Sequence, residues 1–191
     1  MKAIAICGSP RANGNTELLL TRCLDKLAGS GIETQLITLH GKKIHGCMAC
    51  GACRQRQDGA CAIDDDFAEV FEAIKAADII VVGSPVYFGS ATPELMAVLD
   101  RAGYVSRPNG NKYLSRKIGG PIVVARRAGQ NFTFAQLLYW FMINDMVVPG
   151  SSYWNIAVGR DAGEVANDAE GLATVDRFAE NLAWVAKSLR R

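Results

Sequence analysis

Four cysteines lie in one short stretch of the chain, at Cys47, Cys50, Cys53 and Cys61, with two, two and seven residues between them. Cysteine thiolates bind soft metals or exchange electrons as thiol pairs, so this run predicts redox or metal chemistry at one place. From the spacing alone three kinds of site are open: an iron–sulfur cluster, a zinc site or a redox-active thiol pair.

A loop of small and polar residues follows the first apolar run. Residues 8–16 read Gly-Ser-Pro-Arg-Ala-Asn-Gly-Asn-Thr, which is neither a Walker A motif nor the dinucleotide fingerprint G-x-G-x-x-G. Backbone N–H groups at a helix start attract anions, and Arg11 adds a fork of donors that suits phosphate. The loop therefore predicts a phosphomonoester site, with a plain tight turn capped by Asn15 or Thr16 as the alternative.

Length and composition limit the class of protein. The chain has 191 residues, 49% of them hydrophobic, and we expect residues 1–191 to form a single domain with its own core. A net charge of +2 gives no reason to expect a nucleic-acid partner. The apolar run at residues 1–7 is too short for a signal-peptide core or a membrane span. We therefore expect a cytoplasmic protein with no membrane partner, whose cysteines stay reduced.

Apolar runs and helical patterns alternate along the chain. Short apolar runs predict strands at residues 2–7, 33–39, 79–83 and 120–125 and within 147–158. Apolar residues at helical spacing predict helices at residues 15–28, 64–77, 92–102, 132–144 and 163–189. Residues 40–64 show no clear period and predict a loop that carries the cysteine run.

This alternation predicts an α/β fold with a parallel sheet covered by helices on both faces. Five strands in a chain of this length suit a flavodoxin-like doubly wound sheet with the strand order 2-1-3-4-5. Such sheets bind ligands outside the carboxyl ends of their strands, near the switch point of the strand order. The loops after the first, third and fourth strands are therefore expected to hold a ligand.

Two of these loops together resemble the NADPH-dependent FMN reductase family. The first reads Gly-Ser-Pro-Arg at residues 8–11 and Gly-Asn-Thr at residues 14–16, and the second reads Gly-Ser-Pro-Val-Tyr-Phe-Gly-Ser at residues 83–90. The similarity continues through residues 93–95, 123–129 and 150–155 and covers nearly the whole chain. Within that family, the compact cysteine run is similar to that of the iron–sulfur flavoproteins.

The resemblance implies an FMN site at the switch point. It places the phosphate group of FMN on polar residues of the first loop: Ser9, Arg11, Asn13, Asn15 and Thr16. It places the isoalloxazine ring along the second loop and a third loop: Pro85, Val86, Tyr87, Phe88 and Gly89, with Arg126 and Gly129. The chemistry agrees, because a flavin ring needs a flat apolar wall and close backbone donors. The alternatives are core packing for Tyr87 and Phe88 and a solvated charge pair for Arg126 and Arg127.

For the cysteines, a four-iron four-sulfur cluster held by Cys47, Cys50, Cys53 and Cys61 is favoured. Ferredoxins use the related spacing of two, two and three residues, although here the last gap is longer and Ala62 stands where they have proline. Zinc sites usually come as two separated cysteine pairs, and a thiol pair needs only two of these residues. A zinc site and a site without metal both stay open.

The other cysteines and both histidines are expected to lie outside these sites. Cys7 at a strand end and Cys23 on a helix face are predicted to be small buried hydrophobic residues. His40 and His45 are predicted to be surface residues, because four thiolates already complete a site. The aromatic helix at residues 132–144 suits either the core or a subunit interface.

These features predict a flavin-dependent oxidoreductase. FMN would take electrons from NAD(P)H or a ferredoxin and pass them to the four-iron cluster or to an external acceptor. Because the cofactor carries the chemistry, no side chain is assigned as a catalytic residue. The alternatives are an NAD(P)H-dependent FMN or quinone reductase without a cluster, and a redox-sensing module whose cysteine loop binds zinc. The expected partners are a small molecule or an electron-carrier protein, and the resemblance suggests a homodimer or homotetramer.

Overall fold

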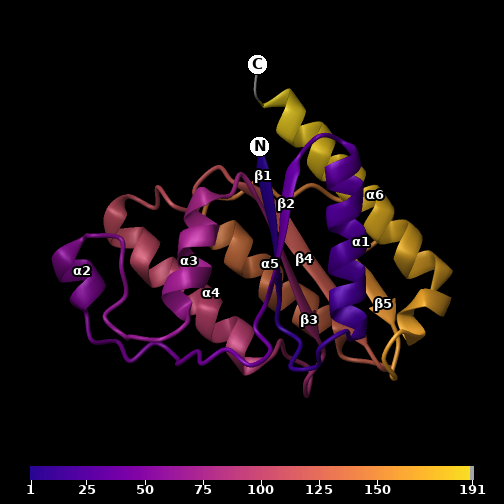
Figure 1. The fold of residues 1–191 in the computed structure, drawn as a ribbon, viewed down its shortest axis with the longest axis horizontal. Coiled ribbons are helices and arrows are strands. Elements are labelled where there is room, and N and C mark those ends of the chain that lie inside the picture. Colours follow the sequence, from indigo (N-terminus) through magenta and orange to yellow (C-terminus); the bar gives the residue numbers. More distant parts are fainter. Residues whose placement is uncertain (190–191) are drawn as a thin grey trace.

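A five-stranded parallel sheet forms the centre of the computed structural model, which describes residues 1–189 (Figure 1). The strand order is β2-β1-β3-β4-β5, which confirms the predicted flavodoxin-like order 2-1-3-4-5. The strands are β1 (Lys2–Cys7), β2 (Glu33–Thr38), β3 (Ile79–Pro85), β4 (Ile118–Ala125) and β5 (Ile156–Val158). All neighbouring strands pair in parallel, so their carboxyl ends lie at one edge of the sheet.

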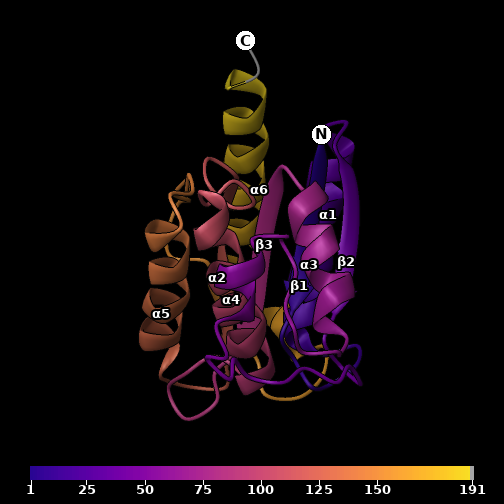
Figure 2. The ribbon, with the colours of Figure 1, turned by 90° about the vertical axis from the view of Figure 1, so that its left-hand side faces the viewer.

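Helices cover both faces of this sheet (Figures 1 and 2). The helices α1 (Asn15–Gly29) and α6 (Ala169–Ser188) lie on one face, and the other face carries α3 (Phe67–Ala76), α4 (Pro93–Ser106) and α5 (Gln130–Ile143). A short helix, α2 (Ala52–Arg56), and two 3-10 turns, η1 (Arg107–Asn109) and η2 (Glu164–Asn167), complete the described helices. None of the helices within residues 1–189 is long and apolar enough to cross a membrane.

The inner strands are buried on both sides. In β1, Ile4 and Ile6 join the core under α3 and α4, whereas Ala3 and Ala5 join the core under α1 and α6. Side chains alternate between the faces of a strand, so a strand that is covered twice must be apolar at nearly every position. This double burial is why the strands can be found in the sequence as continuous apolar runs.

Several predicted boundaries were wrong. The strand predicted within residues 147–158 is only Ile156–Val158, apart from one bridge between Val147 and Ile118. The last helix begins at Ala169 and not at residue 163, because the Asp168 side chain caps it by accepting a hydrogen bond from the Gly171 backbone (2.9 Å). The helix α4 runs four residues past the predicted end at residue 102.

The segment with the cysteines leaves the sheet and returns to the same point. The Lys43 backbone donates to the Asp66 carboxylate (2.6 Å), and the Asp66 backbone donates to the Lys43 carbonyl (3.1 Å). We call residues 43–66 the cysteine excursion. It contains α2, which contacts α4 away from the sheet (Figures 1 and 2). The loop predicted at residues 40–64 thus contains a helix, which at five residues is too short to show a helical period.

The start of α4 is bonded to the loop after β1. Thr92 precedes the helix, and its buried hydroxyl donates to the Gly8 carbonyl (2.7 Å) instead of capping α4. The Gly8 backbone in turn donates to the Gly83 carbonyl at the end of β3 (2.8 Å). A Cβ on Gly8 would lie 2.8 Å from Leu95 Cβ, so only glycine fits this approach. These bonds fix the two predicted ligand loops relative to each other.

We expect the Thr92→Val substitution to lower the free energy of unfolding by about 1–3 kcal/mol. Valine keeps the shape of threonine but removes the buried donor to the Gly8 carbonyl. The matched control is Thr38→Val in β2, which makes the same change at a partly buried strand position. Urea unfolding of both variants tests this expectation, and equal stability losses would contradict it.

Candidate functional site

A cavity of about 400 Å³ lies at the carboxyl edge of the sheet. Small-molecule sites span roughly 300–1,000 Å³, so this cavity is large enough for a cofactor. Its wall comes from the loops after β1, β3, β4 and β5: Ser9, Arg11, Gly14, Asn15, Thr16, Pro85, Val86, Tyr87, Val124, Arg126, Gly159, Arg160, Asp161 and Ala162. The structure thus brings the three predicted ligand loops together and adds a fourth.

One end of this edge cavity suits an anion. The helix α1 begins at Asn15 beside it. Its N-cap residue is Gly14, which has no side chain that could bond to the N–H groups of the first turn. The cavity wall also carries Arg11, Arg126 and Arg160 against the single carboxylate of Asp161. Free N–H groups at a helix start and several guanidinium groups together attract phosphate.

The predicted phosphate residue Asn15 uses its amide to hold the loop after β5. Its Nδ2 group donates to the Asp161 carbonyl (2.9 Å), and its Oδ1 atom accepts from the Val165 backbone (3.3 Å). The Arg11 guanidinium also donates to the Arg160 carbonyl (3.3 Å). Sequence reasoning missed this fourth loop, although the loop after the last parallel strand reaches the same edge as the others.

Only part of the predicted ring wall lines the cavity. Pro85, Val86 and Tyr87 do so, whereas the next two residues form the tip of a turn closed by hydrogen bonds between Tyr87 and Ser90 (2.9 and 3.0 Å). At this tip Phe88 is fully exposed, with a φ of 51° that is unfavourable for a bulky residue.

Two further predicted residues, Asn13 and Gly129, also lie outside the cavity wall. The Asn13 backbone donates to the Glu17 carboxylate (2.9 Å), at the start of α1. Gly129 has a φ of 90°, and an added Cβ would come within 3.0 Å of Val86 Cγ1. Gly129 therefore lies next to the wall residue Val86, which a larger side chain would crowd.

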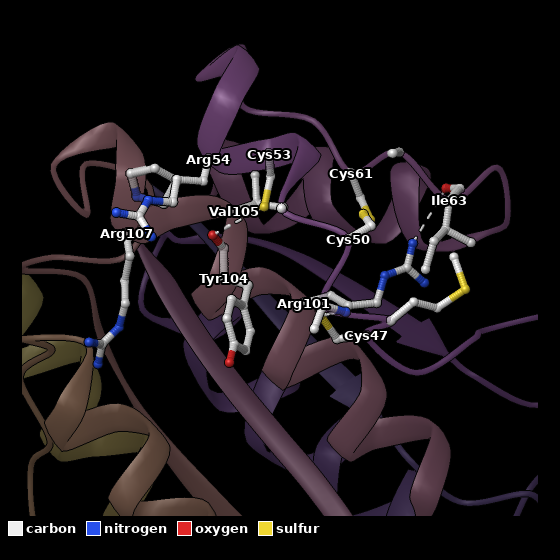
Figure 3. Close-up of a pocket in the computed structure, with 15 residues that line it drawn as sticks. Cys47, Cys50, Cys53, Arg54, Cys61, Ile63, Arg101, Tyr104, Val105 and Arg107 are labelled. Atoms are coloured by element: carbon white, nitrogen blue, oxygen red, sulfur yellow. Dashed lines mark hydrogen bonds between the residues drawn. The ribbon is translucent and has the colours of Figure 1, made fainter.

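A second cavity, of about 470 Å³, lies between the cysteine excursion and the C-terminal half of α4 (Figure 3). All four cysteines of the run line it: Cys47, Cys50, Cys53 and Cys61. No three His, Cys, Asp or Glu side chains within residues 1–189 are close enough to hold one metal ion. The thiols therefore line one cavity without converging on one point.

The backbone of the run curls around this cavity. Ala49 and Gly51 have φ values of 52° and 74°, so left-handed residues stand on both sides of Cys50. The Ala49 backbone donates to the Cys47 sulfur (3.4 Å), and the Cys53 thiol donates to the Tyr104 carbonyl of α4 (3.6 Å). Cys47 and Cys50 are exposed, so the cavity opens to solvent on their side.

A buried ion pair holds the cysteine excursion on α4. Arg101 and Asp65 bond through two pairs of atoms (2.7 and 2.9 Å), and their side chains are 1% and 2% exposed. The same guanidinium donates to the carbonyls of His45 (3.0 Å) and Ile63 (3.5 Å). It thus binds the excursion at two points, one before and one after the cysteines in the sequence. Burial opposes ionisation of Asp65, but its bonds with Arg101 and the His45 backbone prevail and lower its pKa.

The other predicted residues lie where the sequence placed them. Cys7 and Cys23 are buried, and burial raises the pKa of their thiols to about 11 and about 12. His40 and His45 are both exposed. The His40 ring makes a hydrogen bond to the Pro10 carbonyl (2.7 Å), at the rim of the loop after β1.

Sequence comparison finds relatives over the full chain. The profile of the NADPH-dependent FMN reductase family matches residues 1–161. An iron–sulfur flavoprotein of Methanocaldococcus jannaschii is 38% identical over 199 residues, with 100% of both chains covered. An iron–sulfur flavoprotein of Methanosarcina thermophila is 34% identical, with 100% of this chain and 98% of that protein covered.

Structure comparison confirms the fold. The crystal structure of RosB with a bound riboflavin phosphate intermediate has a TM-score of 0.75 and 17% identity, and covers 100% of this chain and 80% of that chain. A flavodoxin from the domain Archaea has a TM-score of 0.60 and 16% identity, and covers 98% of this chain and 99% of that chain. At this low identity the likeness concerns the flavodoxin-like fold alone.

We expect four thiols of the reduced, metal-free protein to react rapidly with a thiol reagent at neutral pH, and two more only after unfolding. The run lines an open cavity, whereas burial keeps Cys7 and Cys23 protonated and inaccessible. Counting thiols before and after adding denaturant tests this expectation. Cys50→Ala should lower the native count to three, Cys23→Ala should leave it at four, and six fast thiols in the wild type would contradict the burial.

Proposed function

This chain belongs to the NADPH-dependent FMN reductase family, and from that premise we propose that it is an iron–sulfur flavoprotein that transfers electrons between FMN and a four-iron cluster. Its membership makes it a flavin-dependent oxidoreductase. The cluster is supported by one observation above all: the four cysteines of the run line a single cavity. Its relatives in two methanogens carry the name iron–sulfur flavoprotein.

In this proposal FMN occupies the edge cavity. Ser9, Arg11 and Thr16 would hold its phosphate together with the N–H groups at the start of α1, and Asn13 and Asn15 would shape the loop around it. The ring would lie along the second loop, against Pro85, Val86 and Tyr87, with Phe88 and Gly89 at the rim and Arg126 and Gly129 on the third loop. The three cavity arginines would offset the phosphate charge.

The residues of the second cavity supply the ligands that a cluster needs. A four-iron cluster takes four cysteine thiolates, and all four cysteines of the run line this cavity. In a four-iron cluster each cysteine binds a different iron, so the thiolates stand around a volume, as they do here. Arg54, Arg101 and Arg107 line the same cavity and would offset the negative charge of the bound cluster.

One helix connects the two cavities. The residue before α4, Thr92, is bonded to the loop after β1, and Arg101 of α4 lines the cysteine cavity. Nine residues of α-helix span about 14 Å, so these two contacts lie about that far apart along one rigid helix. FMN exchanges electrons singly or in pairs and the cluster exchanges them singly, so the pair could connect NAD(P)H or a ferredoxin with a one-electron or two-electron acceptor.

We also propose that the protein works as a homodimer or homotetramer. The aromatic helix α5 packs Trp140 and Phe141 into the core but exposes Phe132, Tyr139 and Met142. An apolar helix face of this kind is typical of a subunit interface. A monomer in sedimentation velocity at micromolar concentration would contradict this part of the proposal.

Reconstitution under anaerobic conditions tests the cluster. We expect the wild-type protein to bind one FMN and about four irons per chain and to show broad visible absorbance beneath the flavin bands. Cys50→Ala should lose most of the iron but keep FMN, whereas Cys23→Ala should keep both. FMN without iron, with brisk oxidation of NAD(P)H, would indicate a reductase without a cluster, and one tightly held zinc ion would indicate the sensor module.

FMN titration tests the edge cavity separately. We expect Arg11→Ala to raise the dissociation constant for FMN roughly 10- to 100-fold, because it removes a charged hydrogen-bond donor from the anion end of the cavity. The control is Arg127→Ala, an exposed arginine that does not line the cavity. No flavin binding by the wild type at saturating FMN would overturn the proposed function as a whole.

A further inference from the structure

Arg101 is a charged side chain in a place that normally holds an apolar one. It is the largest fully buried side chain within residues 1–189. It lies on the buried face of α4, whose other residues there include Leu95, Val98, Ala102 and Val105. Taking a guanidinium ion out of water is unfavourable, and an apolar pair often stabilises a core equally well. Burial of this charge therefore points to a role besides packing.

The hydrogen bonds of Arg101 leave one donor without an acceptor. A guanidinium has five N–H groups. Four of them, on the two terminal nitrogens, donate to the Asp65 carboxylate and to the carbonyls of His45 and Ile63. The fifth, on Nε, is buried and has no partner among residues 1–189. An unsatisfied buried donor is rare in native proteins and indicates that an acceptor is missing.

The cysteine cavity is the place where that acceptor would lie. Arg101 forms part of its wall, together with Cys61 (Figure 3). The Phe67 ring covers one face of the guanidinium (4.1 Å from Cζ to the ring centroid), and Cys61 supplies a sulfur on the same cavity wall. Because Asp65 bonds to both terminal nitrogens, the Nε–H group is left free for a further acceptor.

We propose that Arg101 is a positioning residue that sets the reduction potential of the cluster by donating its Nε–H group to the Cys61 sulfur or an adjacent sulfide. This inference rests on the proposed function, because it requires the cluster. Reduction adds one electron and hence one negative charge to the cluster, and a fixed positive donor stabilises the reduced form more than the oxidised form. Hydrogen bonds to cluster sulfurs and nearby charges are known to set such potentials. Asp65 orients this donor and partly offsets its charge.

The test is an EPR-monitored redox titration of the reconstituted holoprotein and its variants. We expect Arg101→Gln to shift the midpoint potential of the cluster to a more negative value, because it removes the charge. Arg101→Lys keeps the charge and should shift the potential less. Asp65→Asn should shift it in the positive direction, because the arginine charge is then less compensated. The potential of FMN, measured in the same samples, should stay unchanged.

The control is Arg177→Gln on α6, which removes an exposed arginine outside the cysteine cavity and should leave the potential nearly unchanged because water screens that charge. If Arg101 had only a structural role, the Arg101 and Asp65 variants would both lose stability or iron, and their potentials would not move in opposite directions. That result would overturn the inference. If Arg101→Gln does not fold, Arg101→Lys and Asp65→Asn still carry the test. A wild type that binds FMN but no iron would overturn the cluster proposal and this inference together, whereas an intact cluster with unmoved potentials would overturn this inference alone.

Discussion

Parallel strand pairing determines where both cavities can lie. Parallel strands cannot be joined by tight turns, so each connection must cross a face of the sheet, and all the loops that follow strands gather at one edge. The edge cavity forms there, where the chain leaves β1 toward one face of the sheet and leaves β3 toward the other face. The cysteine cavity lies in one of the crossings, between β2 and α3, and so outside the sheet itself.

The helix α4 gives these two places a fixed relation. At its start Thr92 bonds to the loop after β1. Near its end Arg101 donates hydrogen bonds to the cysteine excursion at His45 and at Ile63. Both contacts are buried polar bonds, which are geometrically demanding because a misplaced partner leaves an unsatisfied group in the core. Ordinary apolar packing between them would allow more sliding than these bonds do.

Sequence reasoning recovered the parts of the molecule that depend on local pattern. The strand β1 is buried on both faces, so it can be recognised in the sequence as a continuous apolar run. The two loop motifs located the edge cavity. What it missed depends on contacts between distant segments. The role of Asn15 in holding the loop after β5 requires knowing that the two meet in space. Arg101 did leave a signal, since it stands three residues after Val98 and four before Val105 on an apolar helix face, where a charge must find a buried partner.

The hydrogen bonds between Lys43 and Asp66 have a consequence for how such proteins diverge. Because the chain enters and leaves the cysteine excursion at one point, the segment can be gained, lost or resized while β2 and α3 keep their places. The entropic cost of closing a loop rises only slowly with the length of the loop, so such changes disturb the fold little. The sheet can thus be inherited without the cysteine run, so membership of the family does not by itself imply that run.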